Sequence, residues 1–91
     1  MVKFKNQKEK QLVENILFSI AFNCRFGCIP SIELSRTEYI QDILNTCLKQ
    51  GKYYVDLINK TSKKTKKYQD YTKKLEDINK HSKTLYNLLH N

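Results

Sequence analysis

The chain has 91 residues, enough for one domain, and contains only two glycines and one proline. So few turn-forming residues disfavour a hairpin-rich β fold and favour a few long helices. The formal net charge of +8, from 17 Lys and Arg against 9 Asp and Glu, suits an acidic partner: nucleic acid, an anionic membrane surface or an acidic protein. We predict a single all-α domain over residues 1–91, a small three- or four-helix bundle with a long basic C-terminal helix or helix pair.

The first expected element is a short basic arm, residues 1–6, in which Phe4 packs back onto the fold. A first helix is predicted over residues 7–24, where apolar residues recur at helical spacing from Leu12 to Cys24. Gly27 and Pro30 are expected to end it. The apolar run inside this helix is too short to span a bilayer.

A second helix is predicted over residues 35–50. The sequence Ser35-Arg36-Thr37-Glu38 is a capping box, in which Ser35 accepts a hydrogen bond from an unpaired amide and Glu38 reaches back to the amide of the cap. Paired apolar rows run from Tyr39 to Leu48, and Gly51 is expected to end the helix.

The third segment, residues 53–89, contains no Gly or Pro. Its apolar residues follow steps of four and three, which is a heptad seam, although Thr61, Lys64 and Ser82 are poor seam residues. We expect either one long helix or two helices separated near Lys60–Lys66, where Thr and Ser are modest helix formers. The seam also raises the possibility of a homodimer.

The strongest candidate site is the lysine-rich stretch from Lys60 to Lys74. On a continuous helix Lys60, Lys63, Lys67 and Lys74 would form a ridge beside Tyr68 and Tyr71. Such a ridge could follow a phosphate backbone, and an exposed tyrosine could stack on bases; alternatively the tyrosines fill the seam and the lysines are merely solvated. The predicted partner-binding residues are Lys60, Lys63, Lys64, Lys67, Tyr68, Tyr71 and Lys74.

We predict no catalytic, metal or cofactor site. Cys24 and Cys28 have a C-x3-C spacing, but zinc would need two further ligands and no second paired spacing exists. Apolar packing is the expected role of these cysteines, with a Cys24–Cys28 disulfide as an alternative. Three cysteines without a signal peptide indicate reduced thiols and a cytoplasmic location. No catalytic signature or phosphate-cradling glycine loop occurs.

Three functional hypotheses follow. The first is a non-enzymatic interaction protein, a phage- or plasmid-type regulator or inhibitor, that binds a nucleic acid, a nucleoprotein complex or an acidic host protein through the lysines. The second is a helical bundle acting at the inner membrane surface: in size, helicity and basicity the chain is similar to the immunity proteins against pediocin-like bacteriocins, although no motif aligns. The third is a structural protein that self-associates through the C-terminal seam.

Overall fold

The computed structural model describes residues 2–22 and 33–90, and these residues form three α-helices and no strand. Helix α1 is Gln7–Phe22, α2 is Arg36–Lys60 and α3 is Lys66–His90. The predicted all-α class is therefore confirmed. The last two residues of the predicted first helix, 23 and 24, lie outside the described residues, as do Gly27, Cys28 and Pro30.

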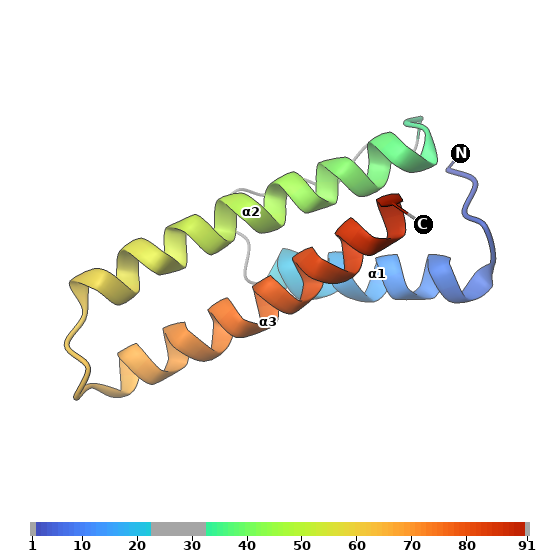
Figure 1. Cartoon of the computed structure of the whole chain (residues 1–91). Coiled ribbons are helices and arrows are strands. Elements are labelled where there is room, and N and C mark those ends of the chain that lie inside the picture. Colours follow the sequence, from blue (N-terminus) through green and yellow to red (C-terminus); the bar gives the residue numbers. More distant parts are fainter. Residues whose placement is uncertain (1, 23–32, 91) are drawn as a thin grey trace.

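Helices α2 and α3 lie side by side and antiparallel, so they form a helical hairpin that runs the length of the molecule (Figure 1). Each has 25 residues and is therefore about 37 Å long at 1.5 Å per residue. The predicted seam is the face of α3 that packs on α2: Ile78 and Leu85 are buried, and Tyr71, Leu75 and Leu89 pack partly buried against the core. The seam thus serves contacts within the chain, and a dimer through it would require the hairpin to open.

The hydrophobic core is centred on α2, which is covered from two sides. Its buried apolar residues come from a broad face, because α3 packs on one flank and α1 on the other. Helix α1 contributes Val13, Ile16 and Ile20 to this core, as its apolar stripe predicts. The α2 contribution is Tyr39, Ile40, Ile43, Leu44, Cys47 and Tyr54.

The predicted end of the second helix at residue 50 is wrong, because α2 continues through Gly51 to Lys60. A glycine inside a helix costs about 1 kcal/mol relative to alanine, but this cost is local. The residues after Gly51 extend the buried face, with Tyr54 buried and Leu57 partly so. Packing of this extra length against α3 outweighs the local cost.

A single continuous helix over residues 53–89 is also wrong. The chain breaks near Lys60–Lys66, as the alternative predicted, but residues 53–60 belong to α2 and do not form a separate helix. Thr61 ends α2, where its amide donates to the Ile58 carbonyl (3.2 Å) and its hydroxyl donates to the Leu57 carbonyl (2.6 Å). Thr65 then precedes α3 and caps its start, since its hydroxyl accepts from the amide of Tyr68 (3.3 Å). The modest helix formers at this point therefore act as caps for both helices.

The start of α2 is fixed by the predicted Ser35 cap. The Ser35 hydroxyl oxygen accepts a hydrogen bond from the Glu38 amide at 3.2 Å. The Glu38 carboxylate accepts in turn from the Ser35 hydroxyl at 2.9 Å, instead of from the Ser35 amide as a full capping box would have it.

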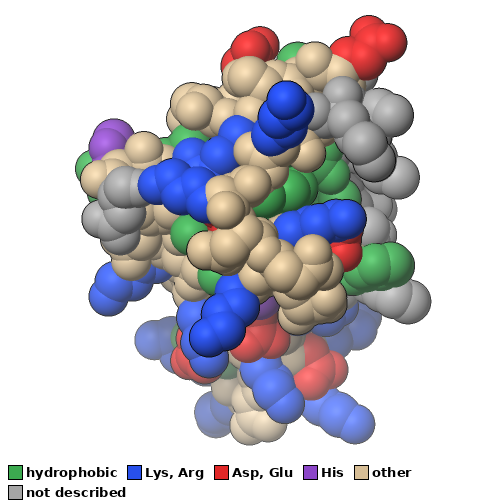
Figure 2. Space-filling view, turned by 90° about the vertical axis from the view of Figure 1, so that its right-hand side faces the viewer, with side chains coloured by type: hydrophobic (Ala, Val, Ile, Leu, Met, Phe, Trp, Pro, Cys, Tyr) green, Lys and Arg blue, Asp and Glu red, His purple; other side chains and the backbone are tan. Residues whose placement is uncertain are grey.

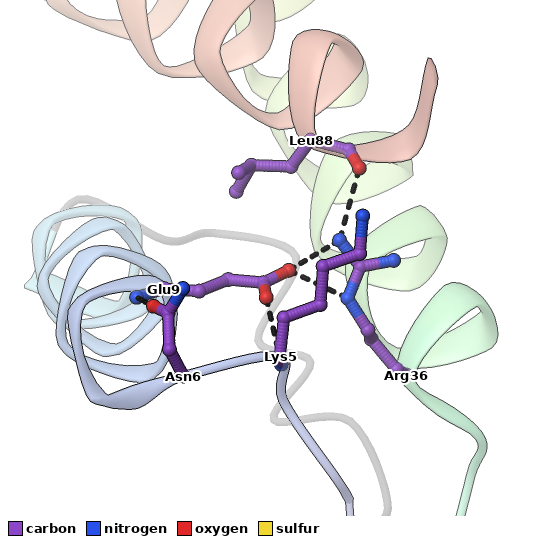
Figure 3. Close-up of polar contacts among 5 residues, drawn as sticks. All are labelled: Lys5, Asn6, Glu9, Arg36 and Leu88. Atoms are coloured by element: carbon purple, nitrogen blue, oxygen red, sulfur yellow. Dashed lines mark hydrogen bonds and ion pairs between the residues drawn. The ribbon is translucent and has the colours of Figure 1, made fainter. Parts of the chain in front are cut away.

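All three helices are joined at one end by a partly buried ion pair between Glu9 and Arg36 (Figure 3). The Arg36 Nε donates to the Glu9 carboxylate at 2.5 Å, and its Nη2 donates to the Leu88 carbonyl at 3.0 Å, in the last turn of α3. The same carboxylate accepts from the Lys5 amide (2.8 Å), while the Glu9 amide donates to the Asn6 side chain (2.8 Å). Arg36 thereby links the start of α1 to the end of α3. We call this group the Arg36 node.

The charge state of Glu9 reflects these contacts. Burial by itself would raise the pKa of the Glu9 carboxyl, but the Arg36 hydrogen bond, the Lys5 amide and the positive charges of both residues outweigh it. The pKa of Glu9 is therefore lowered from its ordinary value of 4.5, and the carboxylate is ionised at neutral pH.

Helix α1 covers only half of the hairpin, the half that carries both chain termini (Figure 1). Its last described contacts are the Gln50 side-chain amide donating to the Ile20 carbonyl at 3.1 Å and the His81 Nε2 lying 3.2 Å from the Ser19 hydroxyl. Since α1 has 16 residues against 25 in α2, it is too short to reach the α2–α3 connection. The connecting end of the hairpin thus projects beyond α1.

Candidate nucleic-acid interface

The projecting end of the hairpin carries a dense group of lysines. From Leu57 to Gln69, between Asp56 and Asp70, the sequence has five lysines and no acidic residue. All five are exposed, and the structure shows no ion pair for any of them among residues 2–22 and 33–90. We call these five residues the lysine tip: Lys60, Lys63, Lys64, Lys66 and Lys67.

The hairpin brings the tip together in a way that differs from the predicted ridge. Lys60 is the last residue of α2, Lys63 and Lys64 lie in the connection, and Lys67 is in the first turn of α3. The continuous helical ridge is therefore wrong, because the helix that would align these residues is interrupted at 61–65. The chain instead reverses between α2 and α3 (Figure 1), and the four lysines lie in or directly beside that reversal.

Lys66 belongs to the tip although it was not among the predicted site residues. It begins α3 directly beside Lys67. The signal that could have found it is the absence of acidic residues over the whole interval between Asp56 and Asp70, which does not depend on helical phase.

The other three predicted site residues, Tyr68, Tyr71 and Lys74, are not among the five lysines of the tip. Tyr71 packs against Tyr54, with the ring centroids 6.0 Å apart, and Tyr68 is half-buried in the seam. Lys74 lies over the ring of Tyr54, with its Nζ 5.8 Å from the centroid, which is a cation–π contact within the hairpin. The contacts of Tyr71 and Lys74 with Tyr54 join α3 to α2, which agrees with the structural interpretation for Tyr71.

The electrostatics of the tip are unfavourable for the protein alone. Lys66 and Lys67 occupy the first turn of α3, which contains no acidic residue. The N-terminal end of a helix carries a partial positive charge, so each cation there costs roughly 0.3–1 kcal/mol. The helix dipole and the lysines thus add to one another, and both favour an anion at the end of the hairpin.

The opposite end of the molecule has a mixed surface. Figure 2 looks at that end and shows Lys and Arg side chains interspersed with hydrophobic, polar and acidic ones. The one described Arg, Arg36, is engaged in the node. The charged side chains of this face are therefore mixed with other side chains, whereas the lysines of the tip have no acidic residue among them.

Other chemistry finds little support in the described residues. Within residues 2–22 and 33–90 no three His, Cys, Asp or Glu side chains come together as metal ligands. Cys47 is buried in the core, whereas Cys24 and Cys28, with their C-x3-C spacing, lie outside the described residues. None of the three helices combines the length and the apolar composition that crossing a membrane requires.

Comparison with known proteins gives no relative. No family model matches the chain, and neither the curated proteins nor the solved structures contain a significant match.

Proposed function

We propose that this protein is a non-enzymatic interaction protein that binds nucleic acid through the lysine tip. The observation that carries the proposal is the concentration of five exposed lysines, with no acidic residue among them, at the one end of the hairpin that α1 leaves uncovered. Lysine ammonium groups attract phosphates without bidentate geometry, so the composition of the tip suits a polyanion better than one specific carboxylate.

The position of the tip supports this proposal in two ways. The tip projects from the body of the fold, so a large ligand can approach it without meeting α1. The lysines at the start of α3 also destabilise the folded chain on their own, and a bound phosphate would relieve that repulsion. A solvated lysine face with no ligand would gain nothing from placing cations at a helix N-terminus.

The test compares two double variants that change the net charge equally. Lys63→Glu with Lys67→Glu alters the tip, whereas Lys80→Glu with Lys83→Glu alters two exposed lysines further along α3. Both lower the formal net charge from +8 to +4, since each substitution removes two units. Binding of a fluorescein-labelled mixed-sequence DNA is measured by anisotropy at low salt.

We expect the tip variant to lose at least about tenfold in affinity and the control variant to lose less than about threefold. Equal losses would mean that net charge alone attracts the nucleic acid, and an unchanged tip variant would refute the proposal. Circular dichroism checks that both variants fold, and the tip variant should be no less stable than wild type because it removes repulsion at the start of α3.

A phage- or plasmid-type regulatory or inhibitory role stays a prediction, as does the nucleoprotein or acidic-protein partner. The alternative of an immunity-type bundle at the inner membrane surface also stays a prediction. Anionic lipid vesicles used in place of DNA test that alternative directly, because cosedimentation through the same lysines, with no binding of DNA, would favour it.

A further inference from the structure

We infer that the lysine tip takes double-stranded nucleic acid in preference to single strands, and that it does so through the phosphate backbone without reading the bases. This inference rests on the proposed function and names the class of nucleic acid. It follows from what the tip contains, what it lacks, and how its charges are spaced.

The tip lacks a surface on which bases can stack. Proteins that bind single strands without sequence preference combine basic grooves with exposed aromatic side chains, each worth about 1–3 kcal/mol per stacked base. The segment from Lys60 to Lys67 contains no aromatic residue. The next rings along the chain are Tyr68, which directly follows Lys67 and is partly buried, and Tyr71, whose ring packs against Tyr54 at 6.0 Å.

The tip also lacks the side chains that read base edges best. In the major groove guanine is contacted by Arg or Lys and adenine by bidentate Asn or Gln, but a lysine ammonium is a point charge and lacks the planar two-pronged geometry of a guanidinium or an amide. From Lys60 to Lys67 the residues other than lysine are Thr61, Ser62 and Thr65. Two of their hydroxyls are engaged locally, because Thr61 donates to the Leu57 carbonyl (2.6 Å) and Thr65 donates to the Ser62 carbonyl (2.8 Å).

Binding must then come from charge alone, and charge favours the denser polyanion. A duplex carries one phosphate charge per ~1.7 Å of its axis, against ~3.4 Å for each strand. The tip presents its cations on two helix ends, Lys60 on α2 and Lys66 with Lys67 on α3, whose axes are about 8–10 Å apart as for packed helices generally. A cluster with this breadth covers several phosphates of a duplex at once but fewer of a single strand.

The number of lysines sets the expected salt dependence. If all five neutralise phosphates, the slope of log K against log salt concentration is about −4.5 for a duplex, from −0.9 per phosphate. For a single strand the same contacts would give a slope of about −3.5, from −0.7 per phosphate. Removal of one lysine, as in Lys63→Ala, should make the duplex slope shallower by about 0.9.

The experiment measures the fluorescence anisotropy of labelled nucleic acids as the full chain is added. The ligands are a 20-base-pair DNA duplex, the RNA duplex of the same sequence, the corresponding single strands and a DNA duplex of unrelated sequence. Each titration is repeated over a range of salt concentrations. We expect both DNA duplexes to bind within about twofold of each other and at least about fivefold more tightly than the single strands. Comparison of the RNA duplex with the DNA duplex of the same sequence shows which of these two the tip binds more tightly.

Tyr68→Leu is the matched variant for stacking, because it keeps an apolar side chain in the seam while removing the ring. Its affinity for every ligand should stay within about twofold of wild type. The inference is overturned if single strands bind as tightly as duplexes, if the two duplex sequences differ by more than about tenfold, or if Tyr68→Leu weakens single-strand binding more than about fivefold. Absence of binding to all of these ligands would instead remove the proposed function itself.

Discussion

The Arg36 node should contribute a large part of the stability of this small fold, and Arg36→Met tests it. Methionine keeps much of the apolar stem of the arginine but removes the guanidinium, so the Glu9 carboxylate loses its ion pair and the Leu88 carbonyl loses its donor. The side chains of Glu9 and Arg36 are 5% and 18% exposed, so the pair is mostly shielded from water.

The expected cost is about 3 kcal/mol. Removing one partner of a fully buried ion pair costs roughly 3–5 kcal/mol, and we take the lower end because Arg36 is partly exposed and Glu9 keeps its hydrogen bond from the Lys5 amide. A chain of 91 residues has a total stability of about 5–14 kcal/mol, so the loss is a substantial fraction. The corresponding fall in Tm is roughly 12–24 °C for a domain of this size.

Urea unfolding followed by circular dichroism at 222 nm measures this cost. Glu9→Gln and the double variant complete a cycle, in which the double variant should cost less than the sum of the two single variants by about 1–2 kcal/mol. Glu76→Gln, at an exposed residue of α3, is the control for loss of one carboxylate. A cost below about 1 kcal/mol for Arg36→Met, or strict additivity in the cycle, would refute the stabilising role of the node.

Three further predictions follow from the same structure. Because the pKa of Glu9 is lowered on folding, the ionised carboxylate stabilises the folded state. This contribution to the free energy of unfolding is complete above the ordinary pKa of 4.5 and is lost as the pH falls through the lowered value. The free energy of unfolding measured from pH 7 to pH 3 should therefore decline less in Glu9→Gln than in wild type. Gly51→Ala should stabilise the chain by about 0.5–1 kcal/mol in urea unfolding, because alanine favours a helix interior more than glycine does. The added Cβ would lie 3.7 Å from Ile78 and 3.8 Å from Leu75, which are ordinary contact distances. A destabilised Gly51→Ala variant would contradict this prediction. Ser35→Ala should cost about 1 kcal/mol, since it removes the acceptor of the Glu38 amide, whereas Ser35→Gly should cost only a few tenths.

Local patterns in the sequence predicted much of the fold. The apolar stripe of α1, the Ser35 cap, the buried face of α2 and the seam of α3 all depend on residues within one or two turns of each other. For such features the spacing of side chains along the chain decides which of them share a helix face. The possible break near Lys60–Lys66 was also visible, because Thr and Ser favour caps over helix interiors for local reasons.

The continuation of α2 through Gly51 was not visible in the same way. A glycine after an apolar row is a normal helix end, and only the partner surface on α3 shows why the helix goes on. This one difference moved the hairpin turn from about residue 51 to residues 61–65. It therefore also moved the lysines from the flank of one long helix to the end of a helix pair.

The amino-acid sequence by itself determined that this chain is helical, basic and rich in lysine between residues 60 and 74, because these properties depend on residue type and short-range spacing. Tertiary structure alone decided that the lysines of the tip meet at the end of a hairpin, and that Arg36 pairs with Glu9, 27 positions away, while donating to Leu88, 52 positions away. Such contacts depend on how helices pack, and packing is set by the sum of many side-chain contacts across elements rather than by any motif in one of them.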